Sequence, residues 1–143
     1  MTQDAAEALQ IGVVAALKAS PAMARLIGGA VFDEVPVNQP HPYVHFGETT
    51  VRATPSSGID AVEIVFTLNG WTRSDGEAAT SRGGRAGRAL AGALRAALHE
   101  QDFAVGPEWG LVQCQHLSSN VAQVDDGLIT HVTATFRAQL DPA

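Results

Sequence analysis

The sequence has little of what most functional sites are built from. It contains one cysteine, Cys114, so it cannot form an internal disulfide, and a single thiol cannot supply a zinc site by itself. The neighbours of Cys114 indicate a buried thiol on a strand. The formal net charge of −6 leaves the chain without the basic footprint that free binding to duplex DNA needs.

Targeting signals and long apolar runs are also absent. The first residues, MTQDAAEALQ, have no basic region ahead of an apolar stretch, so no secretory signal is expected. The longest apolar segments are interrupted by Lys18, Arg88 or Arg95 and fall short of the roughly 20 residues that span a bilayer. We therefore expect a soluble protein with no membrane partner, made in the cytoplasm.

What is present suits a folded domain. The apolar share is 45% and the charged share 17%, values that disfavour a disordered chain. A length of 143 residues predicts one domain, spanning 1–143, with a core that needs neither disulfides nor metal. Because only 6% of the residues are aromatic, Ala, Val and Leu must fill most of that core.

The first 29 residues predict two helices. Asp4 can cap a helix that runs through AAEALQIGVVAALKAS, with Glu7 three residues further on. Ser20 ends that helix and caps a shorter one, PAMARLIGG, in which Pro21 is the first residue and Gly28 marks the end. The segment AVFDEVPVNQP then leaves the helix in extended form, and three prolines keep residues 35–42 out of regular helix.

Four strands are predicted beyond this point. The first runs from Tyr43 to Val51, and the loop ATPSSG follows it. The second alternates clearly, with Val62, Ile64, Phe66 and Leu68 on one face, and is expected to be antiparallel to the first. The third covers 111–117 and the fourth 128–140, with a turn at Asp126-Gly127 within NVAQVDDG. On the fourth strand, Leu128, Val132, Ala134 and Phe136 are expected to face inward.

A long helix is predicted between the strand pairs, within residues 74–100 and starting near Glu77. Its apolar stripe consists of Leu90, Leu94, Ala97 and Leu98, and its opposite side carries Arg82, Arg85, Arg88 and Arg95. Glycines 83, 84 and 87 weaken its first turns. The order predicts an α+β fold: an antiparallel four-stranded sheet with a ββαββ core, the long helix packed on one face, and an N-terminal helix.

No constellation predicts catalysis, a cofactor or a metal. His41 and His45 would lie roughly 13 Å apart along a strand, which separates them too far for one ion. Residues 81–87 lack both GxxxxGK[ST] and GxGxxG. The acidic pair at 125–126 has no partner group nearby in the sequence. Trp71 and Trp109 are expected to cap the core, or to mark contacts if exposed.

The arginines are the sharpest charge feature. The stripe of Arg82, Arg85, Arg88 and Arg95 fits either a solvated helix face or a protein–protein interface, where arginine pairs with carboxylates and stacks on aromatics. The interface hypothesis also includes residues at the strand ends and in the loop between the first two strands: Arg73, Arg52, Thr54 and Ser56.

The order of several short motifs resembles one family. These motifs are LIGGAVFDEVP (26–36), PYVHFGE (42–48), GWTR (70–73), GRAGRALAGALRAAL (84–98), LVQCQHLSS (111–119) and HVTATFRAQL (131–140). Together they are similar to the small tail-completion and tail-terminator proteins of long-tailed bacteriophages and of phage-derived particles such as gene transfer agents.

That resemblance implies a structural protein of the virion tail or neck. Its members form a hexameric ring at the head-proximal end of the tail tube, stop tube polymerisation and offer a surface to the head connector or stopper protein. DNA passes through the ring only as cargo. No catalytic residue, cofactor or metal is carried over. The alternatives are a head–tail adaptor or stopper of the neck, and a small-ligand-binding domain or enzyme.

Overall fold

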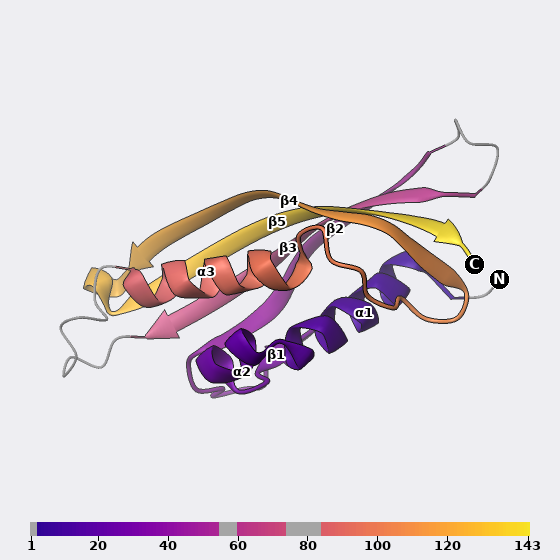
Figure 1. Cartoon of the computed structure of the whole chain (residues 1–143). Coiled ribbons are helices and arrows are strands. Elements are labelled where there is room, and N and C mark those ends of the chain that lie inside the picture. Colours follow the sequence, from indigo (N-terminus) through magenta and orange to yellow (C-terminus); the bar gives the residue numbers. More distant parts are fainter. Residues whose placement is uncertain (1–2, 55–59, 74–83) are drawn as a thin grey trace.

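The computed structural model describes residues 3–54, 60–73 and 84–143 of the chain (Figure 1). The elements follow in the order α1 (Ala5–Ala19), α2 (Pro21–Ile27), β1 (Val31–Phe32), β2 (Tyr43–Ala53), β3 (Val62–Arg73), α3 (Arg85–Leu98), β4 (Trp109–Val124), the 3-10 turn η3 (Asp125–Gly127) and β5 (Ile129–Pro142).

The strands form one sheet in the order β1-β2-β3-β5-β4. The predicted α+β class and the ββαββ order are confirmed, but the predicted four-stranded antiparallel sheet is wrong in detail. A fifth strand, β1, pairs in parallel with the start of β2, and the Val44 amide donates to the Ala30 carbonyl at 2.9 Å. Two residues are too few for strand alternation to show in a sequence.

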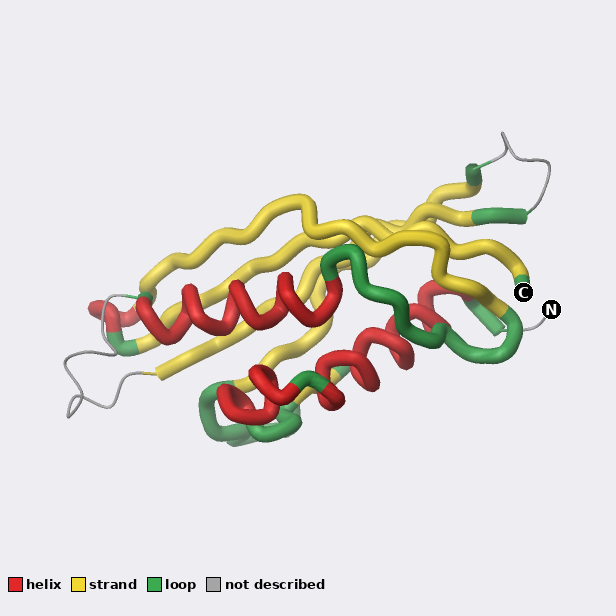
Figure 2. The backbone as a smooth tube through the Cα atoms, in the orientation of Figure 1, coloured by secondary structure: helices red, strands yellow, loops and turns green. Residues whose placement is uncertain are grey.

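The helices α1, α2 and α3 lie against one face of the sheet, and none of the described helices covers the opposite face, which is called the open face below (Figure 2). The predicted caps are confirmed. Asp4 accepts from the Glu7 amide at 3.1 Å at the start of α1, and Ser20 accepts from the Met23 amide at 3.3 Å at the start of α2. Gly28 ends α2 in the left-handed conformation, with φ of 62°.

The long helix starts later than predicted. It begins at Arg85 rather than near Glu77, because Gly84 has φ of 83° and a residue in that conformation cannot continue an α-helix. The rest of the predicted first turns, residues 74–83, lies outside the described residues. The apolar stripe is confirmed: Leu90, Leu94 and Leu98 are buried, and Ala97 packs against the core.

The core lies between the helices and the sheet. Phe66 of β3 and Phe136 of β5 stack there with ring centroids 5.5 Å apart. The predicted inward residues Ile64, Leu68, Val132 and Ala134 are all buried, whereas Val62 is partly buried and Leu128 half-buried, just ahead of β5. The alternation in the sequence therefore identified the buried face of the two central strands.

The strands are longer than predicted. β4 runs to Val124, so the segment 120–124, expected to belong to a turn, is a strand that pairs with β5. Bulges near 112 and 117 let β4 follow β5 over this length. β5 itself continues to Pro142, β2 to Ala53 and β3 to Arg73. Ladder pairing overrides the weak strand preference of Asn, Gln and Ser in these segments.

Candidate protein-interaction surface

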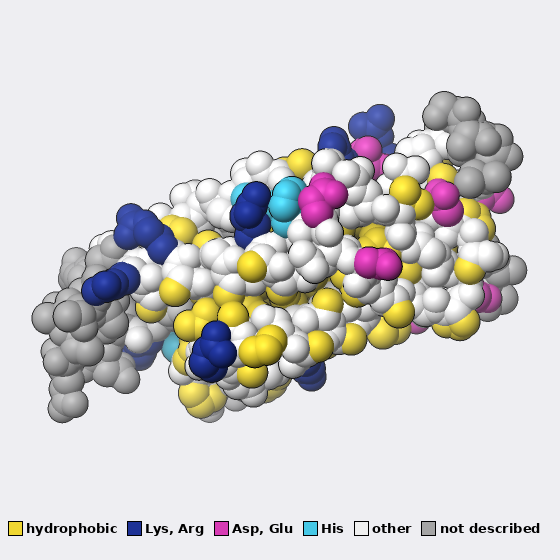
Figure 3. Space-filling view, viewed as in Figure 1, with side chains coloured by type: hydrophobic (Ala, Val, Ile, Leu, Met, Phe, Trp, Pro, Cys, Tyr) yellow, Lys and Arg dark blue, Asp and Glu magenta, His cyan; other side chains and the backbone are white. Residues whose placement is uncertain are grey.

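The exposed side of α3 carries the predicted arginines. Arg85, Arg88 and Arg95 are all exposed, and Gly92 lies among them with no atom near the place of a Cβ. Figure 3 shows several Lys and Arg side chains at the left, around the start of α3, and a second group at the upper right, whereas the Asp and Glu side chains in this view lie in the centre and on the right. Arg82 lies outside the described residues.

The remaining predicted contact residues divide between two ends of the sheet. Arg73 lines a hollow with Ala86 and Leu90, so it lies near the start of α3. Arg52 is exposed and stands opposite Glu63 where β2 and β3 project beyond the helices (Figure 1). Thr54 follows, and its hydroxyl is buried without a hydrogen-bond partner among the described residues. Ser56 lies outside them. The structure thus does not bring all these residues into one patch.

The open face of the sheet carries a hydrogen-bonded aromatic cluster that the sequence analysis missed. Trp71 and His131 stack with centroids 4.0 Å apart and planes 4° from parallel. The Trp71 indole donates to His45 Nε2 at 3.0 Å, so His45 carries its proton on Nδ1, which donates to the Phe46 carbonyl. His131 Nε2 donates to Asn69 Oδ1 at 2.8 Å.

This cluster favours the uncharged form of His131. Burial, and then the nearby His45, lower the pKa of His131 below its ordinary value of 6.5. The cluster also fills the space beside β2, since a Cβ at Gly47 would lie 2.5 Å from the Asn69 side-chain nitrogen. Trp71 therefore orders the open face instead of capping the core. Trp109 is buried in the core, as predicted, and donates to the Gln3 carbonyl at 3.0 Å.

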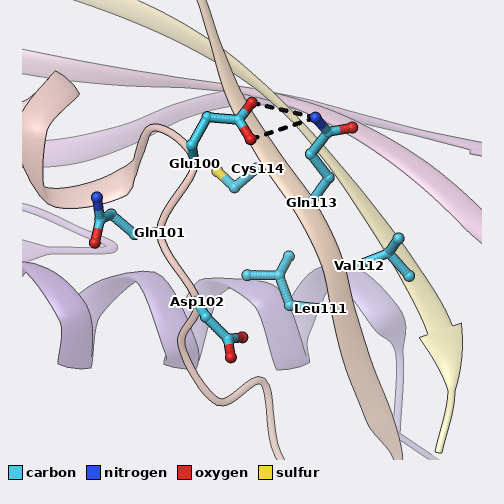
Figure 4. A pocket seen from close by; sticks show the side chains of 7 residues that line it. All are labelled: Glu100, Gln101, Asp102, Leu111, Val112, Gln113 and Cys114. Carbon is cyan, nitrogen blue, oxygen red and sulfur yellow. Dashed lines mark hydrogen bonds between the residues drawn. The ribbon is translucent and has the colours of Figure 1, made fainter.

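Cys114 forms the floor of a hollow of about 230 Å³ between β4 and the segment after α3 (Figure 4). At its rim, the Gln113 amide donates to Glu100 at 3.1 Å. Burial, and then the charge of Glu100, raise the pKa of the Cys114 thiol to about 12, so it is not a nucleophile at neutral pH. The predicted buried strand thiol is confirmed.

The hollow shows no sign of metal chemistry. Across the ranges that the structure describes, no three His, Cys, Asp or Glu side chains are placed to hold an ion. No helix in those ranges is both long and apolar enough to cross a membrane.

The edge strand β4 is the second surface that sequence reasoning missed. Its sixteen residues include no charged residue and no proline, although such residues usually protect a sheet edge. Val112, Leu117 and Val124 are 54%, 46% and 41% exposed. The long run without charged residues in the sequence could have indicated an unprotected edge strand. It was not recognised because the strand was predicted to cover only the seven residues 111–117.

Part of that edge is covered. The Glu100 amide donates to the Cys114 carbonyl at 2.7 Å, and the His116 amide donates to His99 Nδ1 at 2.9 Å. Within residues 3–54, 60–73 and 84–143, nothing else bonds to the outer backbone groups of β4 beyond these two. The covered stretch thus ends at His116.

Comparison with known proteins relates the chain to one family and to solved structures. Residues 12–141 match the family model described as "Tail completion protein gp17". Among solved structures, the chain is similar to a protein in the virion of a native gene transfer agent particle. The TM-score is 0.79, the sequence identity is 26%, and the match covers 98% of this chain and 99% of the other. Among curated proteins, no relative matches.

Proposed function

Because the chain belongs to the gp17 family of tail completion proteins, and is thus a structural tail protein and not an enzyme, we propose that it is the tail terminator of a phage or phage-like particle. In this role the whole chain, 1–143, acts as one domain, and copies of it form a hexameric ring. The ring caps the head-proximal end of the tail tube, stops its polymerisation and meets the head connector, while DNA passes through as cargo.

One observation carries this proposal. The likeness to the gene transfer agent protein covers nearly all of both chains, so the match is to a whole virion component and not to a shared module. The chain is expected in the virion tail or neck, and in the host cytoplasm before assembly. A closed ring of identical copies requires two different surfaces on each copy, and the fold offers edges of different character at β1-β2 and β4.

The arginines of α3 are proposed to contact a neighbouring tail component. Arg85, Arg88 and Arg95 are exposed on a helix whose buried side packs on the core, so their side chains lie where a tube or connector protein can reach them. Arg73 extends this basic end, and Arg52 and Thr54 provide a second contact at the opposite end of the sheet. Arg82 and Ser56 remain part of the hypothesis on sequence grounds alone.

Electron microscopy of particles from cells that lack this gene tests the function. Overlong tubes beside unjoined heads are expected of a missing terminator. Tails of normal length that fail to join heads would assign the chain to the adaptor or stopper role instead. Normal, joined particles would refute both assignments.

A charge reversal tests the arginine face. The double variant Arg85→Glu/Arg88→Glu is expected to fold but to lower the yield of joined particles at least tenfold, because carboxylates replace the guanidinium groups at the contact. Arg25→Glu, on the exposed side of α2, is the matched control. If the double variant assembles as well as the control, the arginines form only a solvated face.

A further inference from the structure

The free part of β4 directs a defined set of backbone groups away from the sheet. In an antiparallel strand, alternate residues point both backbone groups to the same side. The backbone groups of Cys114 and His116 bond to the segment after α3, so they point away from β5. Both residues stand opposite even-numbered residues of β5, so residues of β4 opposite even-numbered β5 residues are the outward ones. The outward residues beyond the bulge, which also pair with even-numbered residues of β5, are Ser119, Val121 and Gln123.

The opposite edge of the sheet has a matching stretch whose outer backbone groups bond to no other residue in the part of the chain that the structure describes. β1 pairs with β2 only at Val44 and His45. The Thr54 amide donates to the Ala61 carbonyl, toward β3, so the alternation turns Thr49, Val51 and Ala53 outward. Val51 is 44% exposed although it is large and apolar.

We propose that the free edge of β4 pairs with the free edge of β2 in a second copy of this chain, with Val121 opposite Val51. This inference rests on the proposed ring and names the junction that would close it. Since β2 runs parallel to β5 and antiparallel to β4, the two strands meet in antiparallel orientation while the helices of both copies stay on the same side. Three outward residues on each strand exchange about six hydrogen bonds.

The register sets the inclination of the strands. Within one chain, the strand pairings place Val51 level with Cys114. Val121 lies about six residues from that level along the strands. Pairing Val51 of one copy with Val121 of the next therefore displaces neighbouring copies by about 20 Å along the strand direction. Four strands at about 4.8 Å spacing make each copy about 19 Å wide. The strands would then incline by about 45° to the ring axis, close to the 35–45° typical of barrels.

The same displacement selects the face that lines the lumen. Seen from the helix side with β2 running upward, β4 is the left edge of the sheet (Figure 1). Because β4 runs downward in this view and Val121 lies beyond Cys114 along it, the next copy to the left sits lower. When the copies are set level around the ring axis, the strands slope up to the right as seen from the helix side. In a closed barrel, the right-handed twist of strands gives this same slope when the barrel is seen from outside. The helices therefore lie outside, and the open face with Trp71 and His131 faces the lumen.

Disulfide cross-linking in purified tails tests the junction. Ala122 and Thr50 are exposed, and the proposed register places them directly opposite each other in a pair without hydrogen bonds, at about 4.5 Å between Cα atoms. That separation permits a disulfide. The variant Ala122→Cys/Thr50→Cys is expected to give a ladder of covalent multimers on a non-reducing gel, and each single variant none. Gln115→Cys/Thr50→Cys, the pair that an undisplaced register would favour, is the matched control.

Each outcome has a separate meaning. The ladder from the first pair alone supports the junction. If tails contain the chain but give no ladder, or give a ladder only from the control pair, the proposed junction is refuted, whereas the proposed ring is not contradicted. A dimer from Ala122→Cys alone means two-fold pairing of β4, and a cross-link to another protein means a different occupant; both overturn the proposal. Tails that lack the chain contradict the proposed function itself.

A proline supplies a second test without new cysteines. Ser119→Pro removes an outward amide while leaving the ladder to β5 intact, and Ser119→Ala removes only the hydroxyl that lies 2.6 Å from His116 Nε2. At equal circular dichroism, the proline variant is expected to enter tails at least tenfold less than the alanine variant. Equal incorporation would overturn the junction.

Discussion

Two glycines of α3 predict opposite effects of the same substitution. Gly87 faces the sheet, and a Cβ there would lie 2.5 Å from Thr130 Cγ2, 3.2 Å from Val121 Cγ1 and 3.3 Å from Val132 Cγ2. Gly92 is exposed, and a Cβ there would meet nothing within 4 Å. Gly87→Ala should therefore destabilise the fold, and Gly92→Ala should stabilise it.

The magnitudes follow from packing and helix propensity. Alanine in place of glycine within a helix gains about 0.5–1 kcal/mol, which is the whole expected effect at Gly92. At Gly87 this gain is opposed by overpacking, which costs about 1–3 kcal/mol when the neighbours cannot move. Thr130 and Val132 are buried and β-branched on a central strand, so they yield little. The net loss at Gly87 should be about 1–2 kcal/mol.

Urea denaturation followed by circular dichroism measures both free energies of unfolding at one protein concentration. The two variants should differ by about 1.5–3 kcal/mol, which corresponds to roughly 3–12 °C in thermal midpoint for a chain of this size. A Gly87→Ala protein as stable as the wild type would show that α3 can move away from the sheet. A destabilised Gly92→Ala protein would show that another surface covers the arginine side of α3.

Three further predictions concern the titratable and aromatic groups. Because its pKa is raised to about 12, Cys114 should resist alkylation at pH 8 in the folded chain and react only on unfolding, as mass spectrometry would show; rapid reaction while folded would contradict its burial in the core and the influence of Glu100. His131 has a lowered pKa, so the unfolded chain binds its proton first, and the free energy of unfolding should fall as pH drops below about 6.5. His131→Gln should flatten this pH dependence, and an unchanged slope would assign it to other groups. Trp71→Phe should cost about 0.5–1.5 kcal/mol through the lost hydrogen bond to His45, measured by urea denaturation; a neutral effect would mean that water replaces the indole donor.

Local rules predicted those parts of the fold that depend on near neighbours in sequence. The caps at Asp4 and Ser20 need only a side-chain oxygen three residues before an amide, and both occur. The alternation on β3 and β5 identified the buried face because both strands lie in the centre of the sheet and have one face covered.

Features that depend on pairing between distant segments were not predictable. β1 is a strand only because β2 lies beside it, and the last part of β4 is a strand only because β5 continues to pair with it. The start of α3 depends on the sign of φ at Gly84, which composition does not show.

The candidate site divides in the same way. Helical spacing predicted the exposed arginines of α3. The cluster of His45, Trp71 and His131 draws on three strands whose register sets which side chains meet, so their positions in the sequence carry no hint of it. The uncharged edge of β4 was visible in the sequence, but its meaning required the knowledge that β4 lies at the edge.

The bonds of His99 and Glu100 to β4 have a consequence for the accuracy of assembly. A strand that docks on a uniform, uncharged edge can slide by two residues and still find partners for its backbone. Here the segment after α3 already occupies the groups at Cys114 and His116, and η3 ends the strand after Val124. An incoming strand can therefore pair only with the stretch between His116 and η3. The length of that stretch, rather than the side chains within it, would fix the register of pairing and so the position of every copy in the ring.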